Sequence, residues 1–252
     1  MQDDVLVHAP TRRTFPKACL IDPTSYGYRL LAAVIDRRAP FAFAWESRRK
    51  RHLLNQLKKQ AAVLRLSEDV RDVTVFKALM VPPGRGRFLR TRPDIATARY
   101  DIAVLVETTT PGQADVLNEN PHWTAMRSEL ERATVEILDI SASNVRALGK
   151  VDHQRHGVFL FNYFYADRLD QNLAVWEHTA GYFEKQTGLD NSIVLLPKPA
   201  SNCQYTLINH CRWDRLSDIL PTLIFRPSFR NYVLRQFEAN QTAAMPVLYR
   251  LA

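Results

Sequence analysis

The segment with the most chemically active side chains is TLINHCRWDRLSD, residues 206–218. It places an amide, an imidazole, a thiol, a guanidinium and an indole in succession, from Asn209 to Trp213. Such groups can bind a metal ion, transfer a proton or hold a polar ligand. The apolar residues around them predict a β-strand over 205–213, and a strand sends successive side chains to opposite faces. The five groups therefore cannot form one cluster.

The alternation divides this strand into two sets of side chains. One face carries Tyr205, Leu207, Asn209, Cys211 and Trp213, and the other carries Thr206, Ile208, His210 and Arg212. Because His210 and Cys211 point apart, no metal site is predicted. Asn209 interrupts an otherwise apolar face, and a buried amide is costly unless it is hydrogen-bonded. We interpret it as a polar anchor in a ligand pocket; the alternative is a structural hydrogen bond.

The candidate site residues come from three predicted elements. Asn162, in the predicted strand GVFLFNYFY (157–165), raises the same question as Asn209. His210 is the candidate catalytic base because the pKa of histidine lies near neutrality, with a structural histidine as the alternative. The candidate ligand-binding residues are Asn162, Asn209, Trp176, Trp213 and Tyr205. For the two tryptophans, packing in the core is the competing interpretation.

The second half of the chain has a clear order of elements. A helix after the first strand has apolar residues from Leu169 to Phe183 at spacings of three or four, and Gly188 is placed to end it. A helix near 216–237 should break at Pro227, since proline lacks the helical N–H. The predicted strands are 157–165, 192–197, 205–213 and 246–251. The order is β-α-β-β-α-β.

The first half repeats much of this order. Its predicted helices cover 43–66 and 113–131, and its strands cover 73–81, 99–108 and 134–140. RLLAAVI (29–35) is the candidate opening strand, with a short helix as the alternative. The second strand of each half ends at a proline, Pro82 or Pro197. A repeat of this length indicates two homologous domains, predicted as 29–150 and 151–252 after an extended N-terminal arm, 1–28.

The repeated order is the ferredoxin-like pattern, in which helices cover one face of a sheet and the other face is bare. A bare apolar face must be covered, and a second copy can cover it. We therefore expect an α+β protein in which two tandem ferredoxin-like domains pack sheet to sheet as an α+β barrel.

Several segments resemble a known superfamily. GVFLFNYFYA, the helix around Trp176, NHCRWDRLSD and RPSFRNYV together resemble the dimeric α+β barrel superfamily, and within it the antibiotic-biosynthesis-monooxygenase type in tandem duplication. The resemblance covers 157–252 well and 68–141 more loosely. It implies cofactor-independent oxidation of aromatic molecules or, in another branch, haem degradation. Asn162 matches the strand asparagine of the haem degraders, but Val233 and Arg127 occupy the positions of their proximal histidine, and neither side chain can ligate iron.

Charge and apolar content indicate which kinds of partner the protein could bind. The 252 residues carry a net charge of +8, much of it in 46–60 and 84–92. A basic patch can hold phosphate backbones, but no nucleic-acid motif accompanies this one, so solvated surface is the favoured interpretation. No apolar run approaches the ~18 residues that span a bilayer, so no membrane partner is expected. Acids near the start and three cysteines without CxxC spacing predict a cytoplasmic protein with reduced thiols.

The leading hypothesis is a protein that binds a small hydrophobic or aromatic molecule and oxidises it without a bound cofactor, as a monooxygenase. No nucleotide-binding, serine-hydrolase or zinc-protease motif is present, and phenols or quinols reacting with oxygen suit the remaining side chains. One alternative is a non-enzymatic scaffold or interaction protein, in which the arm and helix 46–60 contact a partner. The arm is also the candidate homodimer contact. A weaker alternative is nucleic-acid binding through 46–60 and 84–92.

Overall fold

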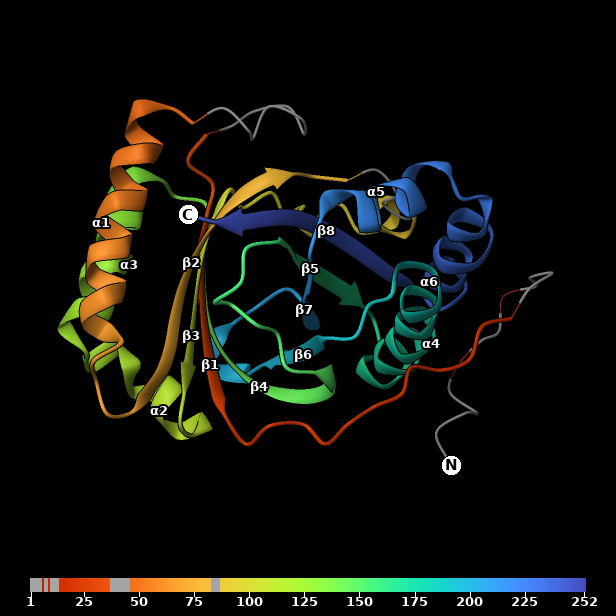
Figure 1. Cartoon of the computed structure of the whole chain (residues 1–252), viewed down its shortest axis with the longest axis horizontal. Coiled ribbons are helices and arrows are strands. Elements are labelled where there is room, and N and C mark those ends of the chain that lie inside the picture. Colours follow the sequence, from red (N-terminus) through yellow and green to blue (C-terminus); the bar gives the residue numbers. More distant parts are fainter. Residues whose placement is uncertain (1–5, 7–8, 10–13, 37–45, 83–86) are drawn as a thin grey trace.

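The computed structural model describes residues 6, 9, 14–36, 46–82 and 87–252. Eight strands form a barrel, and helices cover it on two opposite sides (Figure 1). Parts of three predicted segments lie outside the described residues. They are 1–5, 7–8 and 10–13 of the arm, 43–45 of the first helix, and 84–86 of the basic loop.

The strands are β1 (Gly27–Ala33), β2 (Val70–Met80), β3 (Ile102–Thr108), β4 (Ile137–Gly149), β5 (Val158–Ala166), β6 (Ser192–Pro197), β7 (Leu207–Trp213) and β8 (Thr242–Leu251). The α-helices are α1 (Arg48–Leu64), α2 (Pro111–Val116), α3 (Pro121–Ala133), α4 (Leu169–Thr187), α5 (Leu216–Phe225) and α6 (Arg235–Ala239). Short 3₁₀ segments are η3 (Phe88–Thr91), η4 (Leu117–Glu119) and η5 (Pro199–Ser201), and η6 (Phe229–Leu234) is a turn of π-helix.

The barrel is closed and wholly antiparallel, in the order β1-β3-β2-β8-β5-β7-β6-β4 and back to β1. The prediction of two ferredoxin-like domains packed sheet to sheet is therefore wrong. The two halves meet edge to edge instead, through β2 with β8 and β4 with β6. Edge pairing satisfies the backbone groups that two separate sheets would leave open. The division at residue 150 stays a prediction.

β4 and β8 are both longer than the sequence predicts, and each pairs with one strand of its own half and one strand of the other half. β4 pairs with β1 over residues 137–143 and with β6 over 142–149. β8 pairs with β5 over 242–249 and with β2 over 248–251. Each long strand thus bridges the two halves of the chain.

Local signals account for most element boundaries. α4 ends at Gly188, which adopts the left-handed conformation with φ 66°. The predicted break near Pro227 separates α5 from η6. The segment 29–35 forms a strand rather than a helix, because β1 is buried on both sides: Leu30 faces the barrel interior and Leu31 faces the helices.

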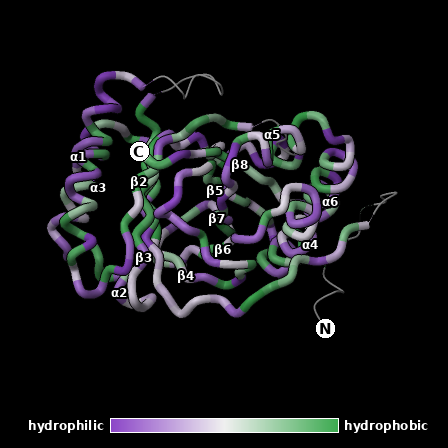
Figure 2. Tube along the Cα trace, in the orientation of Figure 1, coloured by the Kyte–Doolittle hydropathy of each residue, from purple (hydrophilic) through white to green (hydrophobic). Residues whose placement is uncertain are grey.

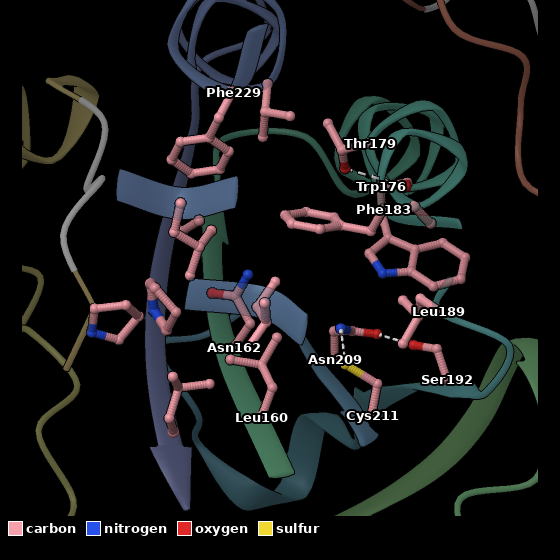
Figure 3. A pocket seen from close by; sticks show the side chains of 18 of the residues that line it. Leu160, Asn162, Trp176, Thr179, Phe183, Leu189, Ser192, Asn209, Cys211 and Phe229 are labelled. Atoms are coloured by element: carbon pink, nitrogen blue, oxygen red, sulfur yellow. Dashed lines mark hydrogen bonds between the residues drawn. The ribbon is translucent and has the colours of Figure 1, made fainter. Parts of the chain in front are cut away.

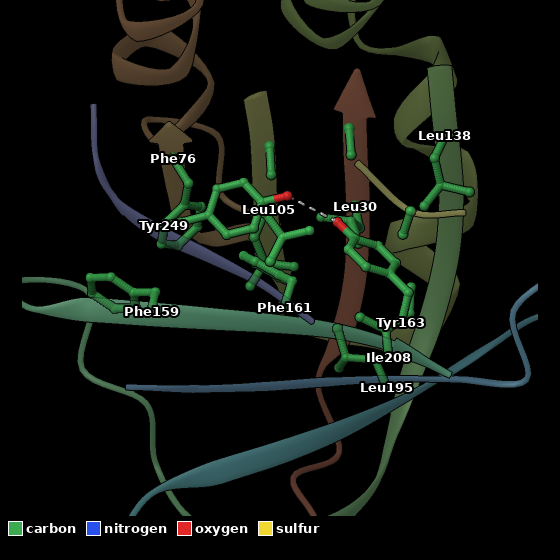
Figure 4. Packing of buried hydrophobic residues seen from close by; sticks show 14 of the residues in the cluster. Leu30, Phe76, Leu105, Leu138, Phe159, Phe161, Tyr163, Leu195, Ile208 and Tyr249 are labelled. Carbon is green, nitrogen blue, oxygen red and sulfur yellow. Dashed lines mark hydrogen bonds between the residues drawn. The ribbon is translucent and has the colours of Figure 1, made fainter. Parts of the chain in front are cut away.

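The apolar residues form three main layers. The barrel interior is filled by aromatic and aliphatic side chains, among them Phe76, Phe159, Phe161 and Tyr163 (Figure 4). One outer layer lies between the barrel and α1 and α3, and the other lies between the barrel and α4, α5, η6 and α6. Hydrophilic residues dominate the outward side of α1 (Figure 2). Among the described helices, none is long and apolar enough to cross a membrane.

The layer beneath α1 contains a fully buried ion pair. Lys50 Nζ lies 3.0 Å from Asp101 Oδ2, and neither side chain is exposed. Asp101 also accepts hydrogen bonds from the backbone N–H groups of Ile35 and Asp36, at 2.7 and 3.1 Å. The carboxylate therefore fixes both α1 and the end of β1.

Asp101→Asn keeps the shape of this side chain but leaves the Lys50 charge buried and unpaired. We expect the free energy of unfolding to fall by about 3–5 kcal/mol. Chemical denaturation measures the change. Adding Lys50→Met should recover part of the loss, and Glu131→Gln in the exposed pair with Arg127 should cost less than about 0.5 kcal/mol. A loss as small as that of the exposed pair would contradict the assignment.

Candidate functional site

A cavity separates the barrel from its second helical layer. Its floor is the outer face of β5, β7 and β8, and its roof is formed by α4, α5 and η6 (Figure 3). It leaves about 60 Å³ for the centres of water-sized molecules. Because one water needs roughly 10–15 Å³ by this measure, the space suits a molecule of about one aromatic ring.

The floor contains a polar row across three neighbouring strands. Asn162 on β5 lies opposite Asn209 on β7 and opposite Pro246 on β8. Strand alternation places both amides on the outer face, between apolar neighbours such as Leu160 and Phe164. Pro246 carries no backbone N–H to donate to the ladder, and a proline is rare inside a central strand.

The two amides differ in their hydrogen bonds. Asn209 Oδ1 accepts from the hydroxyl of Ser192 at 2.6 Å, and Asn209 Nδ2 approaches the sulfur of Cys211 at 3.9 Å. Asn162 Oδ1 is buried and has no hydrogen-bond partner among the described residues. Among the buried side-chain atoms of the described chain that lack such a partner, it is the one that belongs to the cavity lining. The site therefore offers a free acceptor in an apolar setting.

The walls and roof are aromatic. Trp176 and Phe183 come from α4 (Figure 3). Trp213 comes from the end of β7. The indole N–H of Trp213 donates to the Thr187 hydroxyl at 3.0 Å, which fixes the orientation of this ring. The π-helical turn η6 contributes Phe229 to the roof. Single turns of π-helix occur frequently at functional sites.

Among the described residues that line the cavity, none has a charged side chain. All these residues are apolar except for the two asparagines, Thr179, Ser192, Cys211 and the indole N–H groups. Burial raises the pKa of the Cys211 thiol, against the opposing bond from Asn209, so the sulfur is protonated at neutral pH. An anionic ligand would find no counter-charge here, and burying an unpaired charge is strongly unfavourable. The arrangement therefore favours an uncharged ligand.

His210, the predicted catalytic base, lies on the other face of β7, inside the barrel. Its ring stacks on Phe161 with the centroids 4.1 Å apart. Its Nε2 lies 2.8 Å from Nε2 of His153, and its Nδ1 lies 3.0 Å from the carbonyl oxygen of Leu160. His153 Nδ1 lies 3.2 Å from Asp72 Oδ2. His210 thus belongs to a separate buried chain and does not reach the cavity.

The partners of this chain determine where its protons lie. The Leu160 carbonyl only accepts, so Nδ1 of His210 donates and its Nε2 accepts from His153. The Asp72 carboxylate also accepts, so it bonds to His153 Nδ1 at the other end of the chain. Burial, followed by the charge of His153, holds the pKa of His210 well below its usual value. Burial would raise the pKa of Asp72, but bonds from His153 and Thr74 outweigh it and lower that pKa to about 2.

Tyr205 also lies outside the cavity. Its hydroxyl is 3.1 Å from that of Tyr100, and its ring centroid is 5.2 Å from that of Tyr163 in the barrel interior. β7 begins at Leu207, so the strand alternation does not extend back to Tyr205. The prediction that placed Tyr205 on the face of Asn209 is wrong for this reason.

The structure therefore brings four predicted site residues together: Asn162, Asn209, Trp176 and Trp213. It separates His210 and Tyr205 from them. Sequence reasoning missed Ser192, which lines the cavity, because a strand-initial serine carries no signal of its own. Pro246 did carry a signal, since it interrupts a strand, but it suggested a strand start instead.

The lining does not fit a haem. Val233, which the resemblance aligns with the proximal histidine, lines the cavity and cannot ligate iron, and no histidine is among the described lining residues. The space is also far smaller than a porphyrin. Among the described residues, no group of three or more His, Cys, Asp or Glu side chains is arranged to hold a metal ion.

No family model matches the chain, and no curated protein matches its sequence. Solved structures do match its fold. An anthrone oxidase-like protein superimposes with a TM-score of 0.63 at 8% identity, over 90% of this chain and 91% of that one. A candidate monooxygenase of Fusobacterium nucleatum matches with a TM-score of 0.51 at 8% identity, over 90% and 91% of the two chains.

A candidate DyP-type peroxidase of Shewanella oneidensis matches with a TM-score of 0.50 at 10% identity, over 94% of this chain and 96% of that one. The chain shares its overall fold with these proteins. At such identities the likeness concerns the fold alone. The narrower antibiotic-biosynthesis type stays a prediction.

The buried His210 should make stability depend on pH. Its pKa is depressed in the folded protein, whereas the unfolded chain takes up a proton near pH 6.5. Stability is therefore full above pH 6.5 and falls as the pH drops below it, by up to about 1.4 kcal/mol per pH unit for one proton. Asp72 adds a loss only at lower pH, between about 4 and 2.

Denaturation between pH 7.5 and 5 tests this expectation. His210→Gln should flatten the dependence, whereas His52→Gln on the exposed face of α1 should leave it unchanged. An equal slope in both variants would show that His210 titrates as it does in the unfolded chain.

Proposed function

We propose that the protein binds a small, uncharged hydrophobic molecule of about one aromatic ring in the cavity between β5, β7 and the roof helices. The observation that carries this proposal is the buried Asn162 Oδ1, which has no partner among the described residues and lies in an apolar lining. A buried acceptor without a partner costs about 1–3 kcal/mol. A ligand with an O–H or N–H group would remove that cost, and a phenol combines such a donor with an apolar body.

The two asparagines have different roles in this proposal. Ser192 already occupies Asn209 Oδ1, so Asn209 shapes the floor. Asn162 is the anchor that contacts the ligand, and Trp176 and Trp213 are the flat apolar walls. A purely structural scaffold would be favoured if the asparagines were bonded to each other with no space beside them. The Ser192 bond and the adjacent cavity support the ligand site instead.

Oxidation of the bound molecule by dioxygen is the second candidate function. It is favoured by the names of fold relatives, which include an anthrone oxidase-like protein and a candidate monooxygenase. For a ring diol the reaction balances without a reductant: the diol loses two protons and two electrons to become a quinone, and dioxygen gains them to become hydrogen peroxide. The lining residues that the structure describes include no carboxylate or imidazole, so the protons would leave with the peroxide.

The anchoring role of Asn162 can be measured with phenol and toluene, which differ chiefly in the hydroxyl group. Asn162→Leu removes the acceptor at similar volume, so phenol should bind about tenfold to a hundredfold more weakly while toluene binds at least as well. Quenching of tryptophan fluorescence or calorimetry reports both affinities.

Asn55→Leu on the exposed face of α1 is the matched control and should change neither affinity. Equal affinity of the wild type for phenol and toluene would exclude a hydrogen bond to Asn162. Failure of both compounds to bind would refute the ligand site.

Oxygen uptake tests the oxidative function. Methylhydroquinone with the purified protein and no added cofactor should give quinone and peroxide in a 1:1 ratio to the oxygen consumed. Asn162→Leu should lower the rate by about tenfold, because the ring would lose its hydrogen-bonded orientation. A rate equal to that in buffer alone would limit the function to binding.

A further inference from the structure

A strap of N-terminal residues, Phe15–Cys19, crosses the helices that roof the cavity. Figure 1 shows this part of the chain passing α4 on its way to β1. The Phe15 ring lies 4.8 Å from the ring of Tyr182 on α4 and 4.8 Å from that of Tyr232 on η6. The two tyrosine rings stack on each other at 5.9 Å. Phe15 therefore joins two helices that are far apart in sequence.

α4 is shaped to receive the strap. A Cβ atom on Gly181 would overlap the carbonyl oxygen of Pro16 and lie 2.9 Å from the backbone nitrogen of Ala18. Glycine inside a helix costs about 1 kcal/mol relative to alanine. The strap backbone lies so close to α4 that only glycine fits at position 181, which explains why a glycine is present inside the helix.

Polar contacts hold the strap on α4, and Ala9, which precedes the strap, bonds to α6. The Ala18 N–H donates to the Glu177 carbonyl at 3.0 Å, and the Cys19 N–H donates to the Glu184 carboxylate at 3.2 Å. Farther towards the N-terminus, the Ala9 N–H donates to Gln236 Oε1 on α6 at 3.2 Å. Leu6 is buried in the outer apolar layer between the barrel and α4, α5, η6 and α6. The N-terminal segment thus ties α4 to η6 and α6.

The tied helices are the ones that supply the cavity roof. Thr179, Ala180 and Phe183 of α4 line the cavity within one turn of Gly181 and Tyr182. Phe229 and Val233 of η6 line it on either side of Tyr232. A shift of α4 relative to η6 would therefore open the roof, and the strap opposes that shift.

We propose that the strap controls ligand exchange: Phe15 positions the roof helices over the cavity, and a ligand enters or leaves when the strap lifts from α4. This inference rests on the proposed ligand site. Phe15 acts as a positioning residue, through Tyr182 and Tyr232, and does not itself belong to the cavity lining. Segments that cover a site commonly set the rates of binding and release.

Gly181→Ala tests the strap without weakening the helix, because alanine is the better helix former. The probe is 4-iodophenol, which quenches tryptophan fluorescence and would lie beside Trp176 and Trp213. Stopped-flow displacement by excess phenol gives its dissociation rate. We expect Gly181→Ala to raise that rate by about tenfold or more. Gly112→Ala in α2 is the matched control, since its added Cβ would meet open space apart from the Thr110 hydroxyl at 4.0 Å.

Phe15→Ala gives an independent measurement in case Gly181→Ala does not fold. It should also speed dissociation, and Phe15→Tyr should restore the slow rate, which a general loss of stability would not predict. Unchanged dissociation in Phe15→Ala, with 4-iodophenol still bound, would overturn the strap proposal alone. Absence of 4-iodophenol binding in the wild type would overturn the ligand site and, with it, the role of the strap.

Discussion

Edge-to-edge hydrogen bonding closes the barrel, and the rest of the structure depends on this closure. Each half of the chain provides four strands, and its outer edges would be open without the other half. β2 pairs with β8, and β4 pairs with β6, so no strand of the barrel keeps a free edge. Closure also gives the two halves one shared interior, which aromatic rings fill. The helices are then limited to the outer face, where each side forms its own layer.

The two outer layers differ in what they enclose. Beneath α1 and α3, Trp123 is fully buried and the Lys50–Asp101 ion pair is enclosed with it. Beneath α4, α5 and η6 the layer leaves space beside the unpaired amide of Asn162. A buried ion pair tends to fix one arrangement of its neighbours, whereas an apolar cavity with a free acceptor is arranged for a molecule from outside. The asymmetry places the candidate site in the second half.

Strand geometry separates two kinds of chemistry that are adjacent in sequence. Asn209 faces the cavity, and His210, one residue later, faces the barrel interior beside His153. The histidine pair and Asp72 join β2, β7 and the segment between β4 and β5, so they connect the two halves of the chain. Their hydrogen bonds connect parts of the folded barrel, whereas the cavity is lined by amide and aromatic side chains. The N-terminal strap adds a third component, because it acts on the roof from outside.

The sequence by itself determined the local features, because these depend on neighbouring residues. Strand alternation set Asn209 and His210 on opposite faces, apolar spacing defined α4, and Gly188 ended it. It also identified Asn162, Asn209, Trp176 and Trp213, four residues that line one cavity. Only the tertiary structure decided how the halves join. Strands with the same apolar pattern could either pair edge to edge or pack face to face. It also decided the place of Tyr205, the free oxygen of Asn162 and the contact of Pro16 with Gly181, because each depends on partners far away in the chain.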